Sequence, residues 1–304
     1  MPERVRITDV SPRDGLQNEP GFVPTEDKAR LIELLAQTGI DEIEVTSLVS
    51  PKWVPQLADA EELLGRMTAW KPVRSVLVPN EQGFERALAI HRRGLPLKVA
   101  FFTAASETFS RKNTNASIAE SIDRFRPIVE RALEAGMAIR LYISCAVACP
   151  FEGAIAPKAV RRVADLLLDL FPQGRRSQAD IDLGDTIGVA HSHEIQALLR
   201  HFDEPPRGQF TLHLHDTFGR AADCVKTALD LGVRSFDGSV AGLGGCPYAS
   251  TPQKRAPGNI ATETLVRTIQ GAGYETGVNL DRLAEAASFA RQIVAAARGS
   301  PAGA

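Results

Sequence analysis

Short runs of β-branched and other apolar residues recur along the chain, and longer stretches with helical spacing of apolar positions lie between them. Such short runs are typical of strands that are buried in a parallel sheet. We therefore predict eight strands, at residues 4–8, 42–46, 74–78, 97–101, 138–143, 180–183, 210–215 and 234–239.

The segment 25–39 shows the helical pattern most clearly. Leu31, Leu34 and Leu35 follow the spacing of one helix face, Thr25 is predicted to cap the start, and Gly39 to close the end. The same pattern predicts further helices at residues 80–94, 117–136, 156–174, 191–202, 220–232 and 259–273.

Strands that alternate with helices favour a parallel α/β fold, and the count of eight favours a closed (β/α)8 TIM barrel over an open doubly wound sheet. No G-x-G-x-x-G follows the first strand, which argues against a dinucleotide-binding fold. We expect the barrel over about 4–275 and an additional C-terminal helix, packed on it, over about 278–298. No Pro/Ser-rich linker divides the chain, so residues 1–304 are expected to form a single domain.

The composition excludes several classes of partner. The formal net charge of the 304-residue chain is −2, which argues against nucleic acid and anionic membranes as primary partners. No apolar run is long enough to span a bilayer. The N-terminus lacks the layout of a signal peptide and reaches a predicted strand almost at once, so a reducing cytoplasm is the expected compartment.

The four cysteines are too few and too scattered for a disulfide framework. Cys145 and Cys149 are spaced as C-x3-C near a predicted strand end, but no second Cys or His pair accompanies them at a spacing that suits zinc. We interpret them as buried or loop thiols.

A TIM barrel concentrates function at the C-terminal ends of its strands. Polar side chains occur at these ends on five of the predicted strands. They are Arg13, Asp14, Gln17, Glu44, Ser47, Asp185, His213, His215, Asp216 and Cys246.

His213 and His215 give the sharpest local signal. Side chains at i and i+2 of a strand face the same way, and two imidazoles inside a barrel are poorly explained by packing. We interpret this H-x-H as a metal pair, with Asp14 as a carboxylate ligand and Asn259 as a further oxygen ligand. Such a set suits a divalent ion, Mg²⁺ or Mn²⁺. The set depends on barrel closure, which brings the first and seventh strands close together.

Arg13 and Asp14 allow two interpretations. They could form a surface ion pair, which would contribute little stability. Alternatively, Asp14 turns to the metal while Arg13 points at a substrate anion or a developing enolate, and the position after a strand favours this.

Two further segments leave alternatives open. "GLGGCPYA" is either a flexible barrel loop with an incidental thiol, or a mobile lid that delivers Cys246 as an acid or nucleophile. "SRKNTN" (110–115) could meet phosphates, although solvated loop charges explain it equally well.

Six segments, in this order along the chain, resemble the 3-hydroxy-3-methylglutaryl-CoA lyase family of metal-dependent TIM barrels. The resemblance spans about residues 5–279. The segments are "SPRDGLQNE", "EVTSLVSPKWVPQLADAEEL", "LGDTIG", "HLHDTFG", "SVAGLGGCPYA" and "PGNIATETLV".

The resemblance implies cleavage of 3-hydroxy-3-methylglutaryl-CoA to acetoacetate and acetyl-CoA by a retro-Claisen step. It implies Asp14, His213, His215 and Asn259 as metal ligands, Arg13 as the residue that holds the enolate oxygen, and Cys246 as the acid that protonates the acetyl-CoA carbanion or relays a proton to it. Asp185 or His213 would take the proton of the C3 hydroxyl. Glu44 would be a supporting acid, Gln17 and Ser47 would lie near the substrate, and a homodimer is implied.

The sequence departs from the family pattern at two places. Ser11 stands where the family has glycine, and the segment 246–259 is a few residues longer, adding Lys254 and Arg255. The longer segment leaves open a related lyase that acts on a larger or different 3-hydroxyacyl-CoA. A synthase and a non-catalytic acyl-CoA- or metal-binding barrel are further alternatives. A synthase usually carries an extra regulatory domain, and a binding protein has no need of an acid on a glycine-rich loop.

Overall fold

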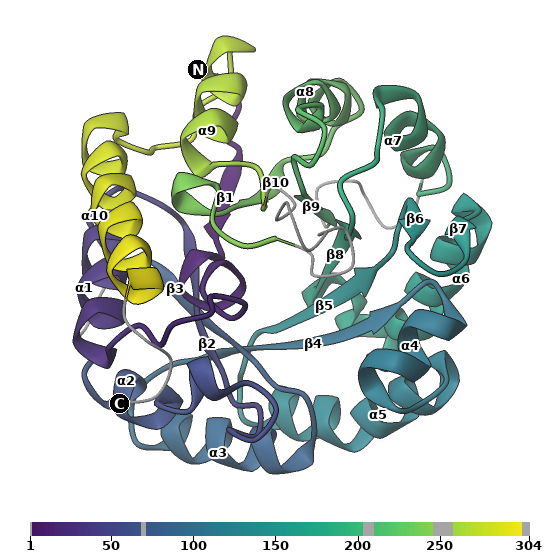
Figure 1. The fold of residues 1–304 in the computed structure, drawn as a ribbon. Coiled ribbons are helices and arrows are strands. Elements are labelled where there is room, and N and C mark those ends of the chain that lie inside the picture. Colours follow the sequence, from purple (N-terminus) through teal and green to yellow (C-terminus); the bar gives the residue numbers. More distant parts are fainter. Residues whose placement is uncertain (1, 68–70, 203–209, 246–257, 300–304) are drawn as a thin grey trace.

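Eight parallel strands form a closed barrel with helices around it, as Figure 1 shows for this computed structural model. The structure describes residues 2–67, 71–202, 210–245 and 258–299. The strand order around the ring is β1–β10–β9–β8–β5–β4–β3–β2, so β10 closes the barrel between β1 and β9. The barrel strands are β1 (Arg6–Asp9), β2 (Glu42–Ser47), β3 (Val73–Leu77), β4 (Lys98–Ala104), β5 (Ile139–Ser144), β8 (Ala179–Asp185), β9 (Phe210–Leu214) and β10 (Ser235–Gly238).

Each barrel strand overlaps one of the eight predicted runs, so the TIM-barrel prediction is confirmed. The predicted helices are also present, including the C-terminal one, α10, which packs against α1. They are α1 (Thr25–Ala36), α3 (Glu81–Arg92), α5 (Ile118–Glu134), α6 (Pro157–Leu168), α7 (Ser192–Leu199), α8 (Ala221–Asp230), α9 (Thr262–Gly271) and α10 (Leu280–Gly299).

Two short α-helices and two short strands in the described part of the chain were not predicted. They are α2 (Ala60–Gly65), α4 (Glu107–Thr114) and the antiparallel pair β6 (Ala148–Cys149) and β7 (Gly153–Ala154). Most of the "SRKNTN" segment lies in the last turns of α4, which ends at the left-handed Asn115 (φ 51°). The predicted cap of α1 is wrong, because Pro24 occupies the cap position and the Thr25 hydroxyl instead donates to Asp59.

The two faces of the barrel strands differ in polarity. Ile181 and Leu183 of β8 belong to the apolar core between strands and helices. Asp182, which alternates with them, contacts Arg140 of β5 inside the barrel. Because side chains of a strand alternate, the barrel interior holds polar and charged groups while the apolar core lies outside the ring.

Candidate active site

A π-helical turn, Ser11–Gly15, leads the chain away from β1 at the C-terminal end of the barrel. Its hydrogen bonds run from Gly15 N to Val10 O (3.2 Å) and from Leu16 N to Ser11 O (3.0 Å). Single π-turns occur frequently at functional sites because the extra residue re-aims the side chains. This turn presents Arg13 and Asp14.

Arg13 is buried between two carboxylates. Its NH2 lies 2.5 Å from Glu44 Oε2 of β2, and its NH1 lies 2.7 Å from Asp14 Oδ1. The two neighbours therefore contact each other, with Arg13 buried and Asp14 half-buried, so they are not a surface ion pair. Burial alone would lower the pKa of Arg13; Glu44 and Asp14 outweigh it and hold the guanidinium charged.

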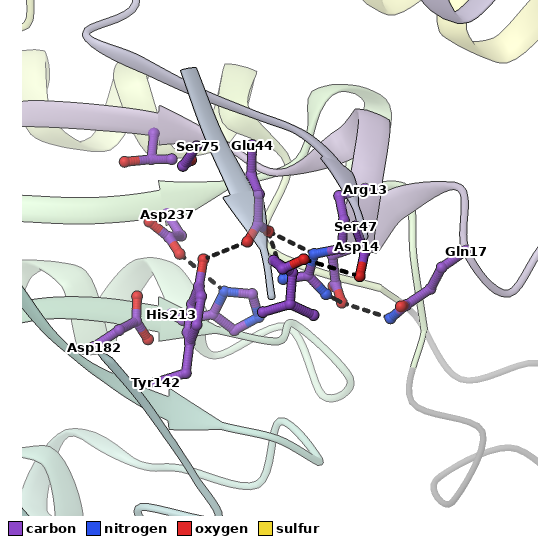
Figure 2. Close-up of polar contacts among 12 residues, drawn as sticks. Arg13, Asp14, Gln17, Glu44, Ser47, Ser75, Tyr142, Asp182, His213 and Asp237 are labelled. Atoms are coloured by element: carbon purple, nitrogen blue, oxygen red, sulfur yellow. Dashed lines mark hydrogen bonds and ion pairs between the residues drawn. The ribbon is translucent and has the colours of Figure 1, made fainter. Parts of the chain in front are cut away.

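Figure 2 shows this chain of contacts, which runs from Tyr142 through Glu44 and Arg13 to Asp14 and Gln17. The Tyr142 hydroxyl of β5 donates to Glu44 Oε1 (3.2 Å), and Gln17 Nε2 donates to Asp14 Oδ1 (2.9 Å). Sequence reasoning missed Tyr142. The signal was available, because Tyr142 is two residues after Arg140 on a predicted strand and so shares its interior face.

Asp14, His213 and His215 form a cluster that could hold a metal ion. One ligand atom from each lies within 4.8 Å of the others, and the two imidazole centroids are 5.3 Å apart. Burial raises the pKa of Asp14, but Arg13 and the two histidines lower it further. The net effect is a pKa of about 2. Burial lowers the pKa of His215 to about 4. At neutral pH Asp14 is thus ionised and His215 neutral, the protonation states that metal binding requires.

Asn259 lies beside this cluster because the backbone around it pairs with the end of β9. Asp216 N donates to Gly258 O and Ile260 N to Leu214 O, which sets Asn259 opposite His215. Asn259 Nδ2 donates to Asp14 Oδ2 (2.8 Å). Its Oδ1 atom and His215 Nδ1 are both buried and have no hydrogen-bond partner among the described residues. Buried acceptors without partners on a carboxamide and an imidazole, beside an ionised carboxylate, fit a divalent cation.

Asp237 of β10 orients His213 and was missed from the sequence. Asp237 Oδ2 lies 3.1 Å from His213 Nδ1, which leaves Nε2 for the Asp14 side. A carboxylate on the second ring nitrogen sets the tautomer and orientation of a ligating histidine. Asp237 sits mid-strand within the predicted run 234–239, and only the barrel register, in which Asp237 is opposite His213, shows that the two residues meet.

Two predicted site residues, Ser47 and Asp185, have other contacts. The Ser47 hydroxyl donates to the backbone carbonyl of Leu77 (3.2 Å). Asp185 accepts the amide N–H groups of Val189 and Ala190, and burial raises its pKa to about 6. These bonds tie Asp185 to the loop after β8. Cys246 lies outside the described residues, as do Lys254 and Arg255.

Comparison with known proteins decides the family. Residues 4–290 match the family described as HMGL-like, which is nearly the whole chain.

The chain belongs to the HMGL-like family.

Curated relatives of this HMGL-like chain agree with the assignment. It is 46% identical over 291 residues to the cytoplasmic 3-hydroxy-3-methylglutaryl-CoA lyase of Danio rerio, which covers 95% of this chain and 83% of that protein. It is 45% identical over 296 residues to the mitochondrial hydroxymethylglutaryl-CoA lyase of Rattus norvegicus, with 97% and 87% covered. The resemblance seen in the sequence segments is confirmed.

Solved structures of HMGL-like proteins share the fold. The HMG-CoA lyase from Brucella melitensis superimposes with a TM-score of 0.89 at 43% identity, covering 96% of this chain and 99% of that one. An HMG-CoA lyase from Acinetobacter baumannii, solved with coenzyme A and 3-methylmalate, gives a TM-score of 0.86 at 32% identity and covers 99% and 97%.

The relatives differ in compartment, since some are named cytoplasmic and others mitochondrial. Within the described part of this HMGL-like chain, none of the helices has both the length and the apolar character that crossing a membrane requires.

Proposed function

We propose that the protein is a carbon–carbon lyase that cleaves 3-hydroxy-3-methylglutaryl-CoA to acetoacetate and acetyl-CoA. The observation that carries the proposal is the buried cluster of Arg13, Asp14, His213, His215 and Asn259 at the C-terminal end of the barrel, in a chain of this family. A retro-Claisen cleavage needs a group that acidifies a hydroxyl and a cation that holds the enolate oxygen, and the cluster supplies residues for both.

Asp14, His213, His215 and Asn259 would hold the divalent ion, Mg²⁺ or Mn²⁺. When bound, such an ion lowers the pKa of a coordinated hydroxyl group, so the hydroxyl loses its proton more easily. The proposed ligand set mixes oxygen and nitrogen atoms: a carboxylate, a carboxamide oxygen and two imidazoles. Such a set is typical of Mg²⁺ or Mn²⁺ sites, whereas structural zinc sites are usually rich in thiolates.

Arg13 would hold the oxygen of the thioester enolate. Its guanidinium is kept charged and in one orientation by Glu44, which is itself held by the Tyr142 hydroxyl. A donor that is oriented before the reaction stabilises the developing charge without reorganisation, and losing such a contact typically costs about 3 kcal/mol or more in the barrier. In this proposal Glu44 acts through Arg13.

The contacts favour His213 over Asp185 as acceptor of the hydroxyl proton. Asp185 is tied to backbone amides of its own loop, while His213 lies in the cluster with its Nδ1 on Asp237. One nitrogen cannot bind an ion and accept a proton at once. Asp14, His215 and Asn259 would therefore keep the ion while the proton moves to His213 Nε2, and Asp237 would stabilise the imidazolium.

Cys246, which follows Gly245 in the sequence, would then protonate the acetyl-CoA carbanion or relay a proton to it. This role requires a thiol rather than a thiolate. Gln17, hydrogen-bonded to Asp14, and Ser47 at the end of β2 would lie near the substrate. A larger or different 3-hydroxyacyl-CoA is the second candidate, favoured by the added length of the segment 246–259.

The remaining parts of the proposal concern the whole protein. It would act as one catalytic domain over residues 1–304, as a cytoplasmic homodimer, with an acyl-CoA as its small-molecule partner. The support is the likeness to relatives named as cytoplasmic lyases and to a lyase solved with coenzyme A.

The test is steady-state cleavage of a panel of 3-hydroxyacyl-CoA thioesters in the presence of Mg²⁺ or Mn²⁺. We expect 3-hydroxy-3-methylglutaryl-CoA to be the best substrate, and Arg13→Lys and Cys246→Ala each to lower kcat by about 100-fold or more. Cys224→Ala, a buried thiol on α8, is the matched control and should leave kcat unchanged. Turnover of larger thioesters alone would favour the second candidate, and no turnover in the folded, metal-loaded protein would overturn the lyase proposal.

A further inference from the structure

Asp9, the last residue of β1, is a buried carboxylate that none of the roles above uses. Its side chain is fully buried, and within the described part of the chain it forms no ion pair. Burial raises its pKa to about 6. A buried carboxylate without a cation is costly for folding, so its presence at a strand end needs an explanation.

The two oxygens of Asp9 hold two different loops. Oδ1 accepts the backbone N–H (2.9 Å) and the hydroxyl of Ser11, at the start of the turn after β1. Oδ2 accepts Val240 N (2.9 Å), in the loop after β10, and the Thr262 hydroxyl (2.6 Å), at the start of α9. Only an ionised carboxylate accepts four hydrogen bonds and donates none, so no neutral residue of this size could replace it.

Each loop carries part of the proposed site. The turn Ser11–Gly15 presents Arg13 and Asp14, whereas the chain from Val240 to Gly245 leads directly to Cys246. We call residues 239–245 the glycine loop. The two loops also touch, because a Cβ added to Gly15 would lie 2.9 Å from both Ser239 Oγ and Leu243 Cβ.

Other contacts hold the glycine loop in the same position. Glu263 Oε2 accepts Ala241 N (3.0 Å), and Ala241 has a left-handed backbone (φ 59°) that a non-glycine residue adopts only when its surroundings impose it. Asn259 Nδ2 donates to Leu243 O (3.2 Å) and Asn18 Nδ2 to Gly245 O (3.3 Å). The loop therefore has a set position relative to Arg13 and Asp14. Asn259 and Asp9 each bond to both sides, and Asp9 is the one that lies outside the proposed ligand set.

We propose that Asp9 is a positioning residue that sets the glycine loop, the segment directly before the proposed acid Cys246 in the sequence, relative to the Arg13–Asp14 turn. The inference rests on the proposed function for its catalytic consequence. Ser11, which stands where the family has glycine, belongs to this arrangement, because its hydroxyl supplies one of the four hydrogen bonds. Proton transfer from a thiol depends steeply on its placement, so a small loop displacement would lower turnover more than substrate binding.

The test is Asp9→Asn. Asparagine keeps the shape of the side chain, but its NH2 group would face N–H or O–H donors that now bond to a carboxylate oxygen. We expect kcat to fall about 30-fold while KM changes less than about threefold. Hydrogen exchange of the amides at 239–245 should accelerate, and exchange in α1 should not change. Asp59→Asn is the matched control, because Asp59 is also a buried carboxylate that accepts a threonine hydroxyl, at Thr25, away from the site. It should leave kcat within about twofold.

A double-mutant cycle separates positioning from a general structural role. If Asp9 acts through Cys246, Asp9→Asn should lower the residual kcat of Cys246→Ala by less than about twofold. Equal effects in both backgrounds, native exchange at 239–245, or an equal fall in Asp59→Asn would overturn the inference. If Asp9→Asn does not fold, two milder variants replace it. Ser11→Gly removes the hydroxyl that bonds to Asp9 Oδ1, and Thr262→Val removes the hydroxyl that bonds to Asp9 Oδ2. Each variant should lower kcat about threefold.

The exchange measurement does not depend on turnover. A wild-type protein without lyase activity would sink the proposed function, whereas unchanged exchange at 239–245 in Asp9→Asn would sink the positioning role.

Discussion

Two buried charge clusters lie one above the other in this barrel, and they differ in how their acids are neutralised. In the interior cluster Arg140 contacts Asp182 (2.8 Å) and Asp237 (2.6 Å), and Lys98 contacts Glu42 (2.7 Å) and Asp180 (2.5 Å). The interior thus contains the cations that its acids require.

The mouth cluster gathers ligand atoms instead. Arg13 binds Glu44 and one oxygen of Asp14, while within the described part of the chain His215 Nδ1 and Asn259 Oδ1 are buried without hydrogen-bond partners. Asp182, His213 and Asp237 also come close enough together for a metal ion, but Arg140 already binds both of these acids. Burying acids beside a histidine therefore does not by itself define a metal site. Among the described residues, the mouth combines several ligand atoms with the single cation Arg13, whereas the interior pairs its acids with Arg140 and Lys98.

The largest expected effect comes from the mouth. Asp14→Asn should lower kcat/KM by about 1,000-fold or more and weaken Mn²⁺ binding, because it removes the only carboxylate of the proposed ligand set. Steady-state kinetics and Mn²⁺ titration measure this. Near-normal turnover would show that the mouth cluster is not the metal site.

Arg140→Met should act on stability. It leaves Asp182 and Asp237 buried without their cation, which typically costs about 3–5 kcal/mol. Chemical denaturation measures the free energy of unfolding. A loss below about 1 kcal/mol would mean that the interior acids do not need Arg140, and the contrast between the two clusters would fail.

Asp237→Asn tests the residue that joins the clusters. It removes the carboxylate from His213 Nδ1, so Mn²⁺ affinity should fall about 10- to 100-fold while the fold persists. Titration with Mn²⁺ on the purified variant is the measurement. Unchanged affinity would show that His213 is oriented without Asp237.

Asp182→Asn should have the smallest effect on turnover, within about threefold. Burial, and then the charge of Asp237, raise the pKa of Asp182 well above its usual value, so of the two acids that Arg140 contacts Asp182 binds a proton more readily, and asparagine resembles its protonated form. A 100-fold loss of activity would contradict this assignment of charge.

The same variant predicts a dependence of stability on pH. With a folded pKa above the unfolded one, Asp182 binds its proton more tightly in the native state, so its contribution to stability is complete below about pH 3.8 and declines as pH rises. Asp182→Asn lacks this decline. The free energy of unfolding of the variant relative to the wild type should therefore increase as the pH rises above about 4. A difference independent of pH would be the contrary result.

The barrel could be predicted from the sequence because its strands are short and buried on both faces, and because a helix follows almost every strand. Ile181 and Leu183 mark β8 in this way even though Asp180 and Asp182 alternate with them. The short helix α2 and the β6–β7 pair were missed, since two to six residues are too few to show a repeated pattern. Thr25 was misplaced by one residue because Pro24 takes the cap position.

The site was predictable where chemistry and position coincide. His213 and His215 face the same way by strand alternation alone, and barrel closure brings Asp14 to them. The contacts of Arg13, Asp237 and Asp9 were not predictable, because each depends on side-chain reach or on register across strands that are distant in sequence.

The most direct test of the account is turnover of 3-hydroxy-3-methylglutaryl-CoA by the purified protein after removal of divalent ions, followed by stepwise return of Mn²⁺. The account predicts negligible acetoacetate formation in the metal-free protein. Full activity should return as the Mn²⁺ site fills, and Asp14→Asn should show no return. Equal turnover with and without metal, or recovery in Asp14→Asn at the same Mn²⁺ concentration as in the wild type, would contradict the metal-dependent lyase site at the mouth of the barrel.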